Sequence, residues 1–121
     1  MEIEEIRTFC LSKKGVTESF PFDNETLVFK IGGKMFALLP LEALSASISL
    51  KADPEWSVEL REEFPQIQGA FHMNKTHWNS VECNGLKKDL ILKLIDHSYD
   101  LVFASLTRKI REEIMNEEDE V

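Results

Sequence analysis

One short stretch, residues 69–83, carries most of the side chains with which this chain could do chemistry. Within seven residues it combines two imidazoles, an amide, an ammonium group and an indole: His72, Asn74, Lys75, His77 and Trp78. A cation and an amide beside an exposed indole can hold a phosphate and stack on a base or another planar group. In the alternative, His77 and Trp78 pack beneath the loop and Lys75 is solvated. The residues alone leave both interpretations open.

Two other kinds of chemistry have weaker support in the sequence. His72 and His77, with Cys83, could converge on a metal ion, but no third ligand has a fixed spacing and no HExxH or CxxC pattern occurs. A nucleophile needs a base beside it and a group that orients the base, yet Ser80 and His77 fall on opposite faces of one predicted strand. We therefore expect a protein that is not an enzyme and that holds no metal or other cofactor.

These side chains must be positioned by a loop that enters a strand. Asn74 favours a turn in which its side chain bonds to the backbone. Residues 77–83 then form a strand in which His77 and Asn79 share the core-facing side of Val81, and Trp78 faces the wetter side. A large outward aromatic is unusual. Either a bulge shifts the register near Trp78 or the indole lies exposed on an open face of the sheet.

Hydrophobic patterns predict the other elements. Residues 26–31 and 34–39 flank Gly32-Gly33, which is a strong signal for a β-hairpin. Residues 46–51 alternate as a half-buried strand does. Helical spacing predicts helices over residues 2–13, 53–64 and 86–106, followed by a last short helix that starts at Thr107. On the half-buried flank of the third helix, His97 is expected to bond to a backbone group or an acid.

Two further expectations concern faces and loops. In the second hairpin strand, alternation places Phe36 on the face opposite Met35 and Ala37. Residues 18–24 are expected to be a loop. Its Phe20 and Phe22 either plug the sheet edge or form the aromatic rim of a pocket.

The fold class that follows is α+β. We predict a single domain over residues 1–115, with an antiparallel-rich sheet of four or more strands and helices packed on one face. Residues 116–121 are predicted to be an acidic, disordered tail. Cys10 and Cys83 are expected to be reduced core thiols.

Charge and hydropathy limit the class of protein. The net charge of −8 opposes non-specific binding to DNA, which depends on Lys and Arg side chains that meet phosphates. The N-terminus, MEIEEIRTF, is acidic where a signal peptide would be basic, and no apolar run approaches the roughly 18 residues of a membrane span. We expect a cytoplasmic protein without membrane contact.

Several stretches together resemble a known family. HMNKTHWNSV is similar to the signature segment of the MmcQ/YjbR family of small bacterial proteins, which are usually labelled DNA-binding. The segments FPFDNETLVFKIGGKMFALL, SLKADPEWSVELRE and LILKLIDHSYDLVFASL resemble further parts of that family. The match runs from about Cys10 to about Ile114. It implies a bacterial protein with a compact α+β domain of the frataxin-like (CyaY-like) kind.

Strand order predicts where positive charge collects. Lys30 and Lys34 flank the hairpin tip, and an antiparallel third strand ends beside them with Lys51. If the strand at 77–83 runs antiparallel to the third strand, Lys75 and His77 join the same end. We therefore predict a basic rim on an otherwise acidic protein. The predicted nucleic-acid or ligand-binding residues are Lys30, Lys34, Lys51, His72, Asn74, Lys75, His77 and Trp78.

The function expected first is a non-enzymatic binding module that resembles the MmcQ/YjbR DNA-binding proteins, with DNA as the partner. The alternative is a protein- or peptide-interaction domain that uses an open sheet face. A small-ligand or metal-binding role comes third.

Overall fold

The computed structural model describes residues 1–71 and 73–116. In this part of the chain the strands are β1 (Val16–Ser19), β2 (Thr26–Ile31), β3 (Lys34–Pro40), β4 (Ser47–Lys51), β5 (Ile67–Gly69) and β6 (Trp78–Glu82). The helices are α1 (Ile3–Leu11), α2 (Pro54–Glu63), α3 (Lys88–Ser105) and α4 (Arg108–Asn116). The strands form one antiparallel sheet in the order β1-β2-β3-β4-β6-β5. The predicted α+β fold class is confirmed.

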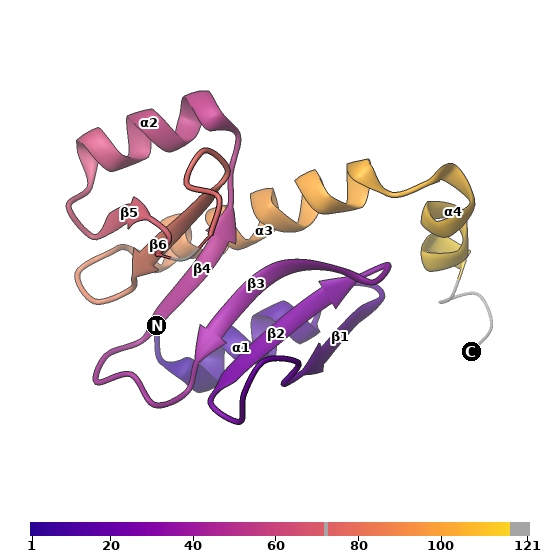
Figure 1. The fold of residues 1–121 in the computed structure, drawn as a ribbon, viewed down its shortest axis with the longest axis horizontal. Helices are drawn as coiled ribbons and strands as arrows, with labels where there is room; N and C mark the ends of the chain where they lie inside the picture. Colours follow the sequence, from indigo (N-terminus) through magenta and orange to yellow (C-terminus); the bar gives the residue numbers. More distant parts are fainter. Residues whose placement is uncertain (72, 117–121) are drawn as a thin grey trace.

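The described helices cover one face of the sheet. In Figure 1, α1 and α3 lie behind the strands, and α2 lies beyond the end of β4 and packs against β5. Side chains on the helix-facing side of the sheet, such as Phe29, Leu39 and Ile48, are fully buried and form the core. No helix of the described residues covers the face toward the viewer, which we call the open face.

The hairpin of β2 and β3 forms as predicted, but a bulge breaks its alternation. Phe29 pairs with Ala37, whereas the next residue, Lys30, pairs with Met35. The extra residue on β3, Phe36, therefore points into the core, where it is fully buried. The expectation that Phe36 faces away from Ala37 was wrong, and the bulge leaves Met35 beside Lys30 on the open face.

The expectation of a loop over residues 18–24 also needs correction. Val16–Ser19 form β1, which pairs with β2 at one edge of the sheet. Phe22, which follows this strand, is 65% exposed and does not plug the sheet edge. The other edge strand, β5, was not predicted either. At the chain's end, Asn116 still belongs to α4, and the predicted tail from residue 117 onward lies outside the described residues.

A serine from α3 fills the place where β3 and β4 separate. Direct pairing of these strands is limited to Ala37 with Leu50 and Leu38 with Ser49. Just beyond that point, the Ser98 hydroxyl accepts a hydrogen bond from Lys51 N–H (2.9 Å) and donates one to the Phe36 carbonyl (2.6 Å). Ser98 is fully buried, so it replaces the missing strand-to-strand bond between two interior groups.

We expect Ser98→Ala to destabilise the fold, because it leaves the Lys51 N–H and the Phe36 carbonyl without a partner. Each buried group that loses its hydrogen bond costs about 1–3 kcal/mol. The measurement is urea unfolding, with Ser105→Ala as the control, since Ser105 lies on the same helix but is exposed. Equal losses in the two variants would contradict a bridging role for Ser98.

Candidate binding face

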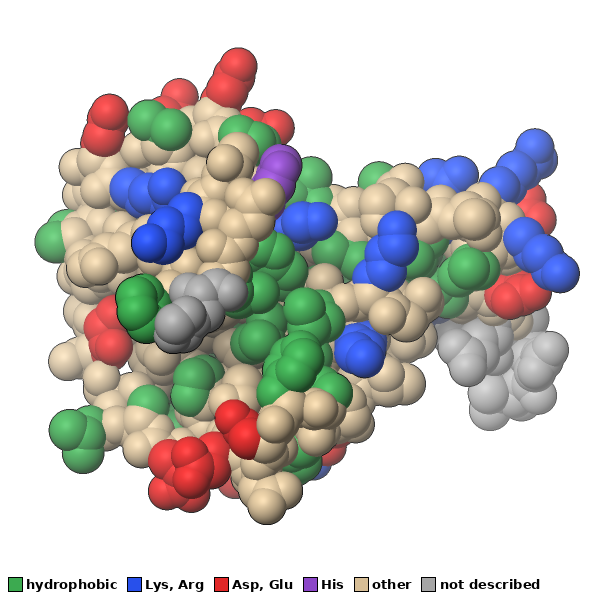
Figure 2. Space-filling model, in the orientation of Figure 1, with side chains coloured by type: hydrophobic (Ala, Val, Ile, Leu, Met, Phe, Trp, Pro, Cys, Tyr) green, Lys and Arg blue, Asp and Glu red, His purple; other side chains and the backbone are tan. Residues whose placement is uncertain are grey.

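The open face is hollowed in its middle, between the β1–β2 loop and the loop that joins β5 to β6 (Figure 2). The hollow has a volume of about 570 Å³. Its apolar lining consists of Phe22, Met35, Leu38, Pro40, Phe71 and Met73, and its polar lining of Asp23, Thr26, Ser49 and Asn74. Phe22 and Phe71 are 65% and 76% exposed. A concave apolar surface with a few polar groups is typical of a binding site.

Local bonds fix the loop that forms one wall of this hollow. As predicted, the Asn74 side chain bonds to the backbone: its Oδ1 accepts from Thr76 N–H (2.9 Å). The Asn74 carbonyl accepts from the N–H groups of His77 and Trp78, which ties the turn to the start of β6. His77 is half-buried, and its carbonyl accepts from Ala52 N–H (2.8 Å). His72 lies outside the described residues.

A guanidinium group from α2 holds the same loop from behind. Arg61 donates from Nε to Asn79 Oδ1 (2.7 Å) and from Nη2 to the carbonyl oxygens of Lys75 and Trp78. Asn79 is 2% exposed and donates in turn to Ser57 Oγ (2.9 Å). Within the described part of the chain, no carboxylate pairs with Arg61. Carbonyl and amide dipoles of the loop and β6 therefore balance its charge.

The Arg61–Asn79–Ser57 network was not predicted from the sequence, although the position of Asn79 pointed to it. Asn79 was placed on the core-facing side of its strand, beside Val81. A buried amide needs hydrogen-bond partners, and helix α2 is the nearest source of polar side chains. Arg61 itself gave no signal, since its neighbours Glu62 and Glu63 make this stretch look like a solvated helix face.

Trp78 is buried, as the alternative interpretation of this stretch expected, and neither the bulge nor the exposed indole is found. The register of β4 and β6 is continuous from Ser47–Glu82 to Lys51–Trp78, so no bulge shifts it. Alternation puts the indole on the open-face side, yet Trp78 is only 8% exposed. The 70–77 loop folds back at the start of β6 and bonds to both the Trp78 N–H and its carbonyl. The indole is therefore not available for stacking, and among the described residues of this loop the exposed aromatic side chain is that of Phe71.

The strand order that a basic rim requires is confirmed, since β4 pairs antiparallel with both β3 and β6. Two of the predicted lysines reach the open face. Lys30 pairs with Met35 there. Lys51 lies two residues after Ser49 on β4 and therefore shares its face, and Ser49 lines the hollow. In Figure 2, Lys and Arg side chains lie above the central apolar area and to its right as far as α4, where acidic side chains lie among them. Other Asp and Glu side chains lie below the apolar area, to its left and at the upper edge.

The other two lysines are placed differently. Lys34 Nζ lies 3.4 Å from Ser105 Oγ and 3.5 Å from the Ser105 carbonyl oxygen, at the C-terminal end of α3. It therefore points to the helix side of the hairpin. The Lys75 side chain lies so close to Gly69 that a Cβ atom added to this glycine would be 3.2 Å from it. Lys75 Nζ is 5.9 Å from the centre of the Phe71 ring.

The remaining titratable groups of the sequence analysis, His97 and the two cysteines, are at least half-buried. His97 Nε2 accepts from Asp53 N–H (3.0 Å), as expected of a half-buried partner to the backbone. Burial lowers the pKa of His97 and outweighs the opposite effect of Asp53 and Asp100. Cys10 and Cys83 are buried and unpaired, and burial raises their pKa values to about 12 and about 11. Among the described residues, no three His, Cys, Asp or Glu side chains are grouped for a metal.

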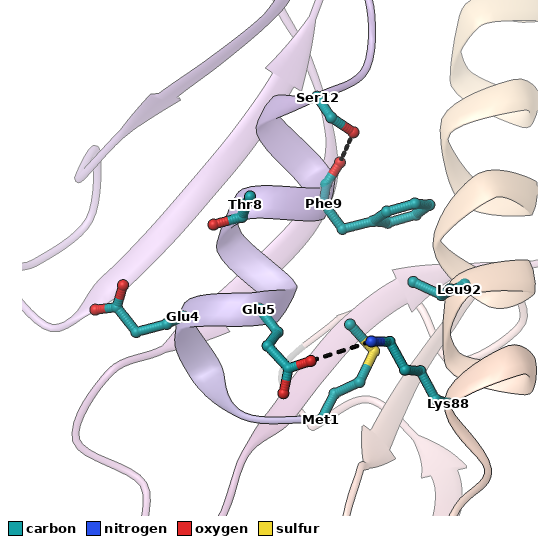
Figure 3. A pocket seen from close by; sticks show the side chains of 8 residues that line it. All are labelled: Met1, Glu4, Glu5, Thr8, Phe9, Ser12, Lys88 and Leu92. Carbon is teal, nitrogen blue, oxygen red and sulfur yellow. Dashed lines mark hydrogen bonds and ion pairs between the residues drawn. The ribbon is translucent and has the colours of Figure 1, made fainter.

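A second hollow lies on the helix side, between α1 and α3 (Figure 3). Phe9 and Leu92 extend toward each other across it, and an ion pair between Glu5 and Lys88 (3.2 Å) spans one end. The pKa of Glu5 is lowered by a hydrogen bond from the Glu2 N–H and by Lys88. Because these charged groups already bind each other, this hollow offers a ligand less than the open face does.

The fold is that of a small α+β domain in which no described helix covers one face of the sheet. Comparison with known proteins identifies the family. The YjbR family model matches residues 11–101. YbdF of Escherichia coli O157:H7, an uncharacterised protein, is 36% identical over 107 residues, which cover 88% of each chain. YjbR of Escherichia coli K12, also uncharacterised, is 31% identical over 100 residues, covering 82% of this chain and 85% of YjbR.

Solved structures agree with this assignment. The crystal structure of a Deinococcus radiodurans protein with a DUF419 domain has a TM-score of 0.87 and 38% identity, and the match covers 93% of this chain and 87% of that one. A Pseudomonas syringae protein has a TM-score of 0.72 and 30% identity, with 84% and 99% of the two chains covered. The chain belongs to the YjbR family. None of its described helices is long and apolar enough to cross a membrane.

Proposed function

We propose that this chain is a non-enzymatic binding module for nucleic acid, and that it binds through the open face and its basic end. The observation that carries the proposal is the position of Lys30 and Lys51, on the open face, at the end of the sheet where β2 and β4 stop. Lys75 follows on the loop that enters β6 at this end. Phosphate contacts from Lys and Arg supply most of the affinity for nucleic acid, and steering by a local basic surface does not require a positive net charge.

The test is a binding titration at several salt concentrations with a labelled oligonucleotide. Lys30→Glu combined with Lys51→Glu should weaken binding strongly and reduce the slope of log K against log salt by about 1 for each lysine that meets a phosphate. The melting temperature should change little, because both side chains are only half-buried.

Lys87→Glu combined with Lys88→Glu is the matched control. It changes the net charge equally at the start of α3, where Lys88 faces α1 on the helix side (Figure 3) and where acids suit the helix dipole. The control should bind like the wild type. Binding that is absent at low salt, even after deletion of residues 117–121 with their four acidic side chains, would refute the proposal.

A protein or peptide partner is the second candidate, and the apolar lining of the open-face hollow favours it. Met35 and Met73 contribute to that lining. Flexible methionine side chains are common at surfaces that accept varied apolar partners. A peptide held in this way would bind with little dependence on salt, which separates the two candidates in the same titration.

A further inference from the structure

Two phenylalanine rings stand on opposite sides of the open-face hollow. Phe22 comes from the β1–β2 loop and Phe71 from the β5–β6 loop, and both line the same hollow. They are 65% and 76% exposed. Single exposed apolar side chains are ordinary, but two large rings that border one concave apolar surface indicate a surface built to be covered.

The chemistry of the hollow fits a flat group with polar edges. Its floor, from Met35 and Leu38, is apolar, and hydroxyl, amide and carboxylate groups stand at its margin in Ser49, Asn74 and Asp23. A nucleobase has apolar faces that stack on aromatic rings and an edge that forms hydrogen bonds. Bases inside a duplex stay stacked on one another, so only unpaired bases could enter such a hollow.

Cations lie where the phosphates of the same ligand would pass. Lys75 Nζ is 5.9 Å from the centre of the Phe71 ring, and Lys30 lies beside Met35 of the floor. Proteins that bind single strands without reading a sequence combine aromatic rings with nearby cations in this way. The charged group of the lining, Asp23, accepts hydrogen bonds from the N–H groups of its own loop, so the lysines beside the hollow favour a polyanion over an uncharged apolar partner.

The strands beneath the hollow argue against an extended peptide. Such a peptide gains affinity by adding to an unpaired strand edge. The hollow's floor belongs to β3 and β4, which both have strands on each side in the sheet order. No free edge is present there among the described strands, so a peptide would have to rely on side-chain contacts alone.

We infer that the hollow receives unpaired bases and that the ligand is single-stranded nucleic acid, with its phosphates on Lys30, Lys51 and Lys75. This inference rests on the proposed function and makes it narrower. It assigns Phe71 and Phe22 to the site, neither of which the sequence-based set of binding residues contained.

The experiment compares the full chain's affinity for one labelled single strand of about 12 nucleotides, a length that one small domain can cover, with its affinity for the same sequence as a duplex. The single strand should bind more tightly. Phe71→Ala should weaken its binding by roughly 5- to 150-fold, the loss expected for one stacked base, and leave the salt slope unchanged. The substitution should change the melting temperature little, since Phe71 is 76% exposed.

Phe20→Ala is the matched control, because Phe20 lies in the β1–β2 loop and is 45% exposed but does not line the hollow. It should bind like the wild type. Equal binding of duplex and single strand, or equal effects of Phe71→Ala and Phe20→Ala, would overturn this inference and leave the proposed function standing. Failure of both nucleic-acid probes to bind, with the acidic residues 117–121 deleted as well, would overturn the two together.

Discussion

We expect Trp78→Ala to lower the free energy of unfolding by about 3–5 kcal/mol, the usual loss when a large buried aromatic side chain is removed from a core. Trp78 is 8% exposed although it sits on the open-face side of β6. Ala70 and Asn74 bond to the Trp78 backbone, so the cavity left by the substitution would lie where the segment that presents Phe71 and Lys75 is attached to β6. Ligand binding should therefore fall together with stability.

The indole can be observed directly in a Trp56→Phe background, which leaves Trp78 as the sole tryptophan. Its fluorescence should be blue-shifted and protected from acrylamide in the native state. Unfolding of this parent and of its Trp78→Ala derivative in urea gives the energy difference, and circular dichroism follows both variants equally well. A red-shifted, readily quenched emission together with a loss below about 1 kcal/mol would show that the indole is a surface group after all.

Elements with strong local signals were predicted correctly. Gly32 and Gly33 adopt φ angles of 58° and 82°, as a tight hairpin turn requires. Asp53 caps α2 by accepting from the N–H groups of Glu55 and Trp56, and Pro54 occupies the first turn. In these places a few neighbouring residues determine the backbone without help from the rest of the chain.

Features that depend on distant partners were missed. The edge strands β1 and β5 have only four and three residues, too few for a pattern of alternation, and they exist because β2 and β6 offer them pairing groups. The bulge at Phe36 depends on how β2 meets β3. In each case tertiary contacts decided what the local sequence left open.

The candidate site divides in the same way. The antiparallel pairing that brings Lys30 and Lys51 to one end of the sheet was predicted correctly from the order of the strands. It could not show that Lys34 turns to the end of α3, because residue alternation past a bulge cannot be counted from sequence. Phe71 was within the stretch first singled out, but an apolar residue beside a run of polar ones looks like core until its exposure is known.

The arginine behind the loop carries the other large effect. We expect Arg61→Ala to destabilise the protein by about 3 kcal/mol or more, because each hydrogen bond to a charged group contributes about 1.5–3 kcal/mol. Three acceptors each lose a hydrogen bond at once: Asn79 Oδ1 and the carbonyl oxygens of Lys75 and Trp78. Arg108→Ala is the control, since that side chain is 87% exposed and its ion pair with Glu112 lies on the surface.

Arg61→Lys separates charge from geometry. Lysine keeps the positive charge but cannot reproduce the planar fork that reaches Asn79 and two carbonyl groups together, so it should recover only part of the stability. Amide hydrogen exchange should quicken at Ala70, whose N–H bonds to the Trp78 carbonyl that Arg61 also holds. Single-strand binding should weaken even where Arg61→Lys remains folded, because the loop that carries Phe71 and Lys75 is no longer fixed. If Arg61→Ala and Arg108→Ala cost the same, and Ala70 exchanges no faster in either, then α2 does not position this loop and Arg61 only fills space behind it.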